Sequence, residues 1–218
     1  VDFQDHLVGI ITADDIMDVI HEEAGEDYSR LAGMSDNEST SDTAMETAKK
    51  RLPWLIGLTF MGMITAWMLS FFEDTLARVV LLSAFIPVIS GMAGNTGTQS
   101  LAVAIRGIST GEIKESSKVK LAGRELGSGF ITGIVCGIVI FIIIIVMYRE
   151  PVLGIIVSGS LIASMSVATI IGTVVPLLMN KMGIDPAVAS GPFITTANDI
   201  ISLLIYFALA NVFMSSLL

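Results

Sequence analysis

The sequence predicts an all-α polytopic membrane protein with five transmembrane helices, preceded by a short β-α segment and a linker helix. Apolar residues make up 53% of the chain and charged residues only 15%, and the mean hydropathy is +0.77. The apolar residues are gathered in runs of the roughly 20 residues that a bilayer core about 30 Å thick requires. A soluble domain of this length has a much lower apolar share.

The net charge of −9 belongs to the N-terminal part of the chain. Residues 1–51 contain thirteen Asp and Glu against four Lys and Arg, whereas residues 52–218 contain eight of each kind. Cys136 is the single cysteine, and both histidines, His6 and His21, precede the apolar runs. An intramolecular disulfide is therefore excluded, as are thiolate and histidine metal sites in the membrane part.

The first residues predict one strand and one helix. Leu7–Thr12 has the apolar composition of a short buried strand, and Ala13–Glu23 predicts a helix with Ile16, Val19 and Ile20 on its apolar face. One strand and one helix cannot bury a core. We therefore expect the chain to begin within a domain, as a fragment, and it shows no signal peptide.

Seven acidic residues run along this helix and just beyond it: Asp14, Asp15, Asp18, Glu22, Glu23, Glu26 and Asp27. Such a run is typical of a solvated helix face. The same side chains offer hard oxygen ligands for a divalent cation such as Mg²⁺, shared with another subunit or domain. The spacing leaves both interpretations open.

A polar linker separates this segment from the apolar runs. Residues 33–47 are rich in Ser, Thr, Asp and Asn, which predicts a linker with several potential helix N-caps. A helix is expected over about Thr43–Leu52, with Lys49, Lys50 and Arg51 at its favourable C-terminal end. Pro53 is expected to stop or kink this helix at the membrane.

The five expected spans are Pro53–Phe72, Val79–Ile105, Phe130–Tyr148, Val152–Met179 and Pro186–Leu218. Basic residues gather before the first span, between the second and third, and between the fourth and fifth. The positive-inside rule then places the N-terminus in the cytoplasm and the C-terminus outside. The predicted location is the cytoplasmic (inner) membrane, which the chain crosses several times.

The fifth span contains the only ionisable side chain between Asp185 and the C-terminus, Asp199. A carboxylate at that depth costs about 2.5–3.5 kcal/mol on insertion scales. Two roles would explain this carboxylate. It could cap a helix or accept hydrogen bonds inside a helix bundle, or it could line an aqueous or ionic path. We favour the ion path.

The second span contains an unusually polar stretch, Pro87–Ser100. Asn95 and Gln99 lie four residues apart on one helix face, among three glycines. Hydrogen bonds between helices would explain them. A pore wall, in which Gly exposes backbone carbonyls and amides offer neutral oxygens, is the interpretation we prefer.

Small residues recur every four positions in the third and fourth spans. In the third, the row includes Gly129, Gly133 and Gly137; in the fourth, it runs from Ser160 to Gly172. Such rows are typical of close helix packing.

These motifs together resemble the MgtE-type magnesium transporters. Leu7–Asp15 followed by Glu22–Asp27 is similar to the end of the second CBS domain of that family. The membrane motifs that carry the resemblance are Arg51–Leu55, Gly91–Ser100, Arg106-Gly107 with Gly111-Glu112, and Asp185–Asp199. Gly191 stands where some members have Asn.

The resemblance implies a homodimer with one Mg²⁺ pore between the subunits, formed by the second and fifth spans. Asp199 matches the central pore carboxylate, and Gly91, Asn95 and Thr195 match positions along the pore. The acids that match the family's regulatory Mg²⁺-binding cluster are Asp15, Asp18, Glu23, Glu26 and Asp27. Residues 1–32 then form the remnant of a cytoplasmic CBS domain, residues 33–52 the linker and connecting helix, and residues 53–218 the pore domain.

Physical reasoning supports the same function. Mg²⁺ keeps most of its water and binds through one or two carboxylates, and a twofold axis would bring two copies of Asp199 together. Selectivity among Mg²⁺, Mn²⁺ and Co²⁺ is left open. The transported ion is also the expected regulator.

Three rival functions are distinguishable. An ion-coupled secondary carrier for divalent cations would also place an Asp at the membrane midplane. An intramembrane enzyme would need a pair of carboxylates, a histidine or another base beside a nucleophile, and the membrane part has one such Asp and no His. A simple membrane anchor would have no use for Asp199, Asn95 and Gln99 together.

Overall fold

The computed structural model describes residues 6, 9–34, 38–113, 117–186 and 189–213. Its elements are all helices: α1 (Ala13–Leu31), α2 (Ala44–Ser70), α3 (Glu73–Arg78), α4 (Leu81–Ser109), α5 (Lys118–Tyr148), α6 (Pro151–Lys181) and α7 (Gly191–Val212). The predicted all-α class is therefore confirmed for this part of the chain.

Within the described residues, four helices are long and apolar enough to cross a membrane: α2, α5, α6 and α7. The second expected span lies in α4, which is not among the four. Its 29 residues are sufficient in length, but its amide, hydroxyl and glycine residues lower its hydropathy. A fifth span thus remains a prediction.

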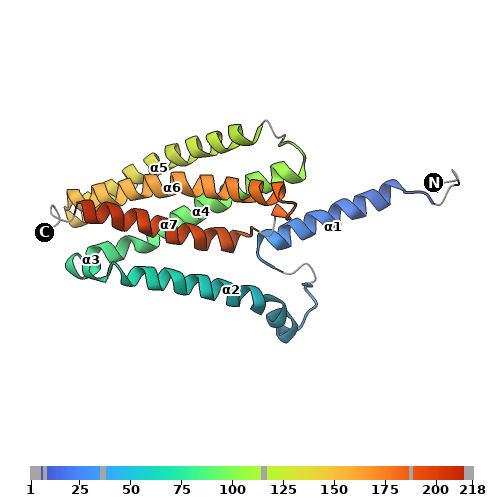
Figure 1. Cartoon of the computed structure of the whole chain (residues 1–218), viewed down its shortest axis with the longest axis horizontal. Coiled ribbons are helices and arrows are strands. Elements are labelled where there is room, and N and C mark those ends of the chain that lie inside the picture. The colour runs from blue at the N-terminus through green and yellow to red at the C-terminus, as the bar shows by residue number, and fades with distance from the viewer. Residues whose placement is uncertain (1–5, 7–8, 35–37, 114–116, 187–188, 214–218) are drawn as a thin grey trace.

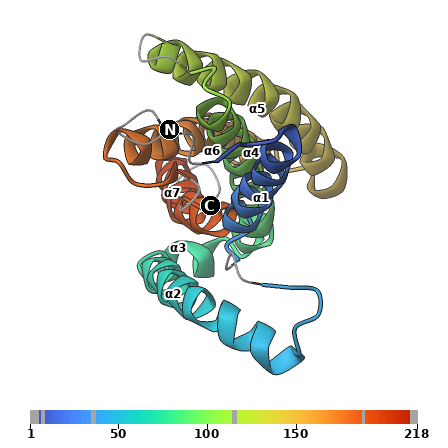
Figure 2. The same ribbon diagram turned by 90° about the vertical axis from the view of Figure 1, so that its right-hand side faces the viewer.

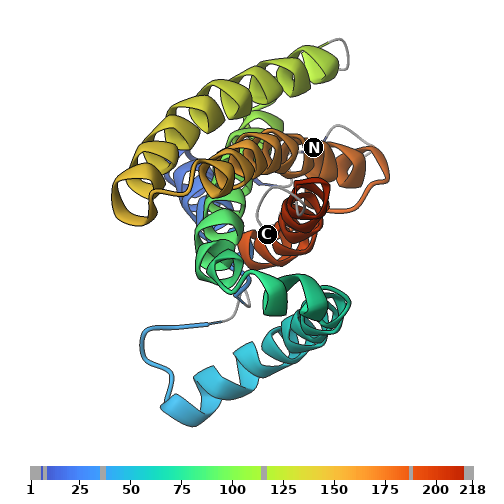
Figure 3. The ribbon, with the colours of Figure 1, turned by 90° about the vertical axis from the view of Figure 1, so that its left-hand side faces the viewer.

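The long helices run roughly along one axis, and α1 extends beyond one end of the bundle (Figure 1). Helices α4, α6 and α7 pack against one another. Viewed from the two ends, α5 and α2 lie on opposite sides of this group, with α5 against α6 and α2 against α7 (Figures 2 and 3). Because successive long helices run in opposite directions, the connections after α4 and α6 lie at the same end as α1.

Two groups of buried apolar side chains hold the bundle together. The larger one contains Leu82 and Ile89 of α4, Val157 of α6, and Tyr206 and Phe207 of α7. The Tyr206 hydroxyl donates a hydrogen bond to the Leu82 carbonyl at 2.9 Å, so this aromatic ring is buried with its polar atom satisfied. A smaller group lies nearer the start of α7 and includes Leu101, Ile105 and Ile194.

The rows of small residues are packing faces, as the sequence predicts. Gly133 of α5 lies against the Ile162 backbone of α6, where an added Cβ would come within 3.0 Å of the Ile162 Cα. Gly129 and Gly137 lie on the same buried face of α5. The outward face of α5 is apolar and exposed, for example at Val139 and Val146, as expected for a surface in contact with lipid.

The N-terminal segment differs from the expectation. Residues 7–8 of the expected strand lie outside the described residues, and residues 9–12 form no strand, with Ile10 and Ile11 about four-fifths exposed, at 77% and 80%. The described residues supply no second strand to pair with them. Helix α1 begins as predicted, with Thr12 and Asp15 forming a capping box, but it continues to Leu31 and buries none of its residues.

Helix α2 also differs at Pro53. A second capping box, between Thr43 and Glu46, starts the helix where the sequence predicts. The helix then continues through Pro53 to Ser70. Of the two expected effects of Pro53, a stop or a kink, the stop is therefore wrong. Of the residues in α2, Met68 alone is buried, and the long apolar side chains of Phe60, Met63 and Trp67 are mostly exposed.

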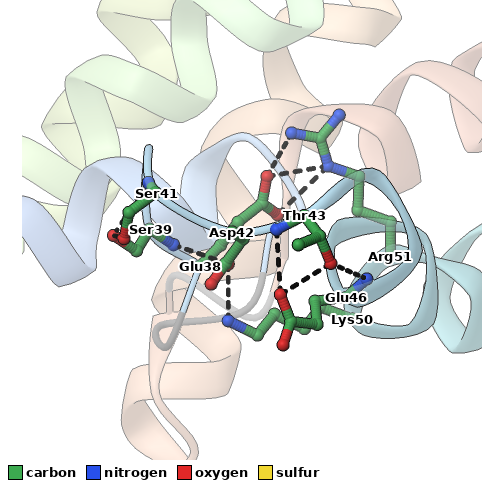
Figure 4. A network of polar contacts seen from close by, with 8 residues as sticks. All are labelled: Glu38, Ser39, Ser41, Asp42, Thr43, Glu46, Lys50 and Arg51. Atoms are coloured by element: carbon green, nitrogen blue, oxygen red, sulfur yellow. Dashed lines mark hydrogen bonds and ion pairs between the residues drawn. The ribbon is translucent and has the colours of Figure 1, made fainter.

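Ion pairs fasten the linker to the first turns of α2 (Figure 4). Asp42 accepts a hydrogen bond from Lys50 Nζ at 2.6 Å and one from the Ser39 backbone at 2.8 Å. Glu38 accepts a hydrogen bond from Arg51 Nε at 2.9 Å. The Lys50 and Arg51 hydrogen bonds lower the pKa values of Asp42 and Glu38, respectively.

Candidate functional site

The polar stretch of α4 divides into two faces. Gly91, Asn95 and Gln99 are exposed and lie four residues apart along one side of the helix. Most of the residues between them are buried against α6 and α7. The amide groups therefore lie on the face of α4 that the rest of this chain leaves open.

Helix α7 begins at Gly191 with Pro192 in its first turn, where proline's missing N–H is no loss. Thr195 and Asp199 follow, one turn apart and both partly exposed. Asn198, next to Asp199, is 1% exposed. Within the part of the chain that the structure describes, no hydrogen bond or ion pair reaches the Asp199 carboxylate.

The polar faces of α4 and α7 meet at two threonines. Thr98 Oγ1 lies 3.3 Å from Thr195 Oγ1, and it donates a hydrogen bond to the Gly94 carbonyl at 2.9 Å. Gly94 makes this approach possible, because a Cβ there would come within 2.7 Å of the Thr195 methyl group. Thr195 thus lies beside the exposed stripe that contains Asn95.

One turn further along α4, Gly97 receives the side chain of Asn198. A Cβ at position 97 would overlap the Asn198 amide nitrogen. On its other side, the carbonyl of Gly97 occupies the space that a Cβ of Gly172 would need in α6. Helices α4, α6 and α7 therefore meet where positions 97 and 172 have room only for glycine.

This contact fixes how α7 is rotated. Thr195 and Asn198 both face α4, so Asp199 lies at the edge of the packed face instead of inside it. Both polar atoms of the Asn198 amide are buried without a hydrogen-bond partner among the described residues. Burying an amide without hydrogen bonds costs free energy. The side chain stays in this position because it is packed against Gly97.

The start of α7 is also where α1 ends. An ideal Cβ at Gly191 would lie 3.2 Å from the Leu31 carbonyl and 3.4 Å from the Thr98 methyl group. Gly191 is buried, so the absent side chain leaves room for α1 and α4. An asparagine here would need one of these neighbours to move.

The acids predicted as a regulatory cluster are spread along α1. Asp18 and Glu23 are exposed, and Asp15 is engaged in the capping box, which lowers its pKa through hydrogen bonds from Thr12. Glu26 pairs with Arg30 at 3.0 Å, and Asp27 accepts a hydrogen bond from Ser109 Oγ at 2.9 Å. Among the described residues, no three acidic, histidine or cysteine side chains are grouped closely enough to hold a metal ion.

Arg30 joins α1 to the membrane helices. Its guanidinium is paired with Asp185 in the connection between α6 and α7 as well as with Glu26. The Asp27–Ser109 hydrogen bond makes a second link, to the last residue of α4. The C-terminal end of α1 therefore contacts the last residue of α4 and the connection that leads into α7.

Two polar residues of this region were missed from the sequence. Asn198 was overlooked because the charged Asp199 stands next to it. Glu125 was overlooked because it lies outside the third expected span, which begins at Phe130. In the structure Glu125 is 8% exposed and accepts hydrogen bonds from Ser100 Oγ of α4 at 2.9 Å and from the Arg124 guanidinium at 3.1 Å. Glu125 lies one helical turn before Gly129, on the face of α5 that carries the glycine row. This position could have identified it as a carboxylate on the packed face.

Comparison with known proteins assigns the family. The profile of the MgtE family, described as divalent cation transporters, matches residues 86–209, which is more than half of the chain. This chain belongs to the MgtE family. The match includes the polar stretch of α4 and the start of α7 through Asp199.

Curated MgtE proteins match almost the whole chain. The magnesium transporter MgtE of Bacillus subtilis (strain 168) is 49% identical over 212 residues, covering 97% of this chain and 47% of that protein. The magnesium transporter MgtE of Enterococcus faecalis is 47% identical over 213 residues, covering 98% and 47%. The magnesium transporter MgtE of Thermus thermophilus is 32% identical over 220 residues, covering 99% and 48%. The chain thus spans about half the length of these relatives.

Membership in the MgtE family confirms several predictions made from the residues. The resemblance to MgtE proteins is correct, and the family is one of transporters and not of enzymes. Together with four helices able to cross a membrane, it identifies a multi-pass membrane protein.

Proposed function

We propose that this chain is the membrane part of a Mg²⁺ transporter of the cytoplasmic membrane. In this proposal it works as a homodimer, and α4 and α7 of both copies line one pore between the subunits. Relatives that match almost the full chain are named magnesium transporters, which supports Mg²⁺ as the transported ion.

The observation that carries the proposal is the position of Asp199 beside an open amide stripe. The Thr98–Thr195 contact brings the polar faces of α4 and α7 together. Gly91 and Asn95 lie on the α4 side of that contact and Asp199 on the α7 side, and none of the three is buried within this chain. Polar groups left open in an apolar bundle are best explained by a water-filled path.

The chemistry of Mg²⁺ fits such a path. The ion dehydrates reluctantly and usually keeps several waters while it binds one or two carboxylates. A twofold axis would face two Asp199 carboxylates toward one hydrated dication and match its charge. The Gly91 backbone, the Asn95 amide and the Thr195 hydroxyl would then accept or donate hydrogen bonds to its waters. Mn²⁺ and Co²⁺ would meet the same ligands.

The proposed topology has five spans, with α4 as the fifth membrane-crossing helix beside the four apolar ones. The basic residues of the linker and of the connections after α4 and α6 support a cytoplasmic location for those segments. The N-terminus is then cytoplasmic and the C-terminus lies outside. A polar helix in this position is tolerated where it lines a pore.

We further propose that cytoplasmic Mg²⁺ regulates the pore through the end of α1. In this view residues 1–32 are the end of a CBS domain, and Mg²⁺ bridges the acids Asp15, Asp18, Glu23, Glu26 and Asp27 to the membrane part or to the partner subunit. The links from Asp27 to α4 and from Arg30 to the α6–α7 connection give such binding a short route to the pore helices.

Flux into liposomes separates a channel from an ion-coupled carrier. The full-length protein is reconstituted, and Mg²⁺ entry is followed with an internal Mg²⁺ dye, with and without gradients of H⁺ and Na⁺. A pore predicts Mg²⁺ entry driven by the Mg²⁺ gradient and membrane potential alone. Entry that requires a gradient of a second ion would favour the carrier.

A further inference from the structure

A cavity of about 300 Å³ lies between the last turns of α4 and the first turns of α5. Val103 of α4, Ile113 of the connection and Leu121 of α5 form its apolar walls. It is separate from the polar faces of α4 and α7, because it opens beside α5, which packs on the opposite side of the bundle from α2 (Figures 2 and 3).

The first part of the connection, up to Ile113, is held against the end of α4. The Ile113 backbone N–H donates a hydrogen bond to the Gly107 carbonyl at 3.0 Å. The Ile113 side chain lies over Gly107, where an added Cβ would come within 2.6 Å of it. This contact uses backbone and apolar atoms and does not involve the polar side chains that line the cavity.

Those polar side chains favour an anion. Lys120 and Arg124 of α5 line the cavity, as does Ser117, whose side chain makes no capping hydrogen bond. The Arg124 side chain is 65% exposed and donates one hydrogen bond to Glu125, and no second hydrogen bond from its guanidinium reaches another of the described residues. Glu112 also lines the cavity and offsets one positive charge. The surrounding residues 106–124 carry five Lys and Arg against two Glu, in a chain whose net charge is −9.

The surface next to the cavity fits an acyl chain. Ile131, Val135 and Ile138 lie on the same side of α5 as the cavity residues, further toward the middle of the bundle, and they are 65%, 57% and 55% exposed. A ligand with a phosphate at one end and a hydrocarbon tail at the other would meet cations first and apolar side chains next. A free phosphate ion would use only the first half of this arrangement.

We propose that this cavity binds the phosphate-containing headgroup of an anionic phospholipid, with Lys120 and Arg124 as its cationic partners. Basic pockets at the ends of membrane helices are suited to such headgroups, and each Lys or Arg near an anionic lipid contributes about 1 kcal/mol, equivalent to roughly fivefold in affinity. The lipid lies along the outer face of α5, away from the proposed ion path.

Lipid binding to the full-length protein tests this site. Delipidated protein in detergent is titrated with phosphatidylglycerol or with phosphatidylcholine of the same acyl chains, and bound lipid is counted by native mass spectrometry. Tight binding of phosphatidylglycerol is expected, and the double variant Lys120→Gln/Arg124→Gln should weaken it by about tenfold or more. Lys181→Gln, an exposed basic residue at the end of α6, is the matched control and should bind like wild type.

A second variant separates the cavity from a general surface charge. Val103→Trp fills the cavity and keeps both cations, and it should weaken phosphatidylglycerol binding as the double variant does. Unchanged binding in either variant would overturn the proposal. So would displacement of the lipid by millimolar inorganic phosphate, which would make the site one for soluble phosphate. Because the measurement requires no transport, its result is independent of the proposed function.

Discussion

The side chain of Asn198 in α7 is packed directly on Gly97 in α4, in space that any other residue's Cβ would occupy. Asn198 is buried, whereas its neighbour Asp199 is partly exposed. One contact between a glycine and an amide therefore decides which face of α7 is packed and which side chain is left beside the polar stripe of α4.

Alanine substitutions at the glycines of this contact should destabilise the protein. Gly97→Ala would force the Asn198 amide to move within a packed interior, at about 1–3 kcal/mol. Gly172→Ala should cost more, because its Cβ meets the backbone carbonyl of Gly97, which cannot rotate away. The measurement is thermal unfolding of the full-length protein in detergent.

Two variants control this comparison. Gly159 of α6 has no atom near the position of its missing Cβ, so Gly159→Ala should be neutral or slightly stabilising. Adding Asn198→Ala to Gly97→Ala should restore part of the lost stability, because it removes the overlapping amide. If the double variant is no more stable than Gly97→Ala, the amide is not the obstacle.

Water should reach Asn95 if the polar stripe of α4 lines a pore. In the full-length protein with Cys136→Ala, a cysteine in place of Asn95 should react with a charged, water-soluble thiosulfonate reagent. Val139→Cys is the matched control: it is also exposed within this chain, but it lies on the apolar outer face of α5, where a charged reagent is excluded. If neither cysteine is labelled, the polar stripe of α4 faces lipid or protein and does not line a water-filled pore.

The sequence predicted the helical class, the positions of the long helices and the packing role of the glycine rows, because hydrophobic runs and small-residue spacing are local signals. It also identified Asp199 and Asn95 as unusual, because polar groups are rare in such runs. It did not predict the Gly97–Asn198 contact. That contact depends on how α4, α6 and α7 are rotated, and no local pattern encodes the rotation.

The N-terminal errors have a related cause. A strand was predicted at residues 7–12 from composition, but strands form only when another strand pairs with them, and the described residues contain none. The helix was predicted to stop or kink at Pro53 on the basis of this single residue, and the stop is wrong. Good helix formers before Pro53 and a long apolar run after it favour one continuous helix, and the missing N–H of Pro53 does not outweigh them.

Neutralising the five cluster acids should abolish inhibition by cytoplasmic Mg²⁺. Asp15, Asp18, Glu23, Glu26 and Asp27 repel one another without a cation, and bound Mg²⁺ would favour a closed arrangement by bridging them. The variant with Asn at the three Asp positions and Gln at the two Glu positions cannot form these bridges. In full-length protein, its Mg²⁺ flux should persist at millimolar internal Mg²⁺.

The same helix provides the control for this experiment. Asp14→Asn with Glu22→Gln removes exposed acids of α1 that lie outside the cluster, and this variant should be inhibited like the parent. Inhibition that survives in the five-acid variant would show that the cluster is only a solvated helix face.

Acid should release the linker from α2. Ion pairs with Lys50 and Arg51 lower the pKa values of Asp42 and Glu38, so these pairs stabilise the linker above the unfolded pKa values. The stabilisation is lost as the pH falls through the folded values, which lie below the ordinary pKa values of these carboxyl groups. A nitroxide at Thr40→Cys, with Cys136→Ala, should be ordered at pH 7 and mobile in that acidic range. Asp42→Asn should mobilise it already at pH 7, and an unchanged spectrum would contradict the proposed role of the pair.

Mg²⁺ uptake by liposomes that contain the full-length protein, compared with Asp199→Asn and Asp199→Ala, tests the proposed pore most directly. Removing the carboxylate removes the charge that would offset partial dehydration of the ion, so both variants should lose Mg²⁺ flux while the dimer stays assembled on size-exclusion chromatography. Asn95→Ala, which removes a neutral contact to a hydrated ion, should retain more flux than either. Wild-type Mg²⁺ flux through the Asp199→Ala protein would contradict the assignment of Asp199 to the ion path.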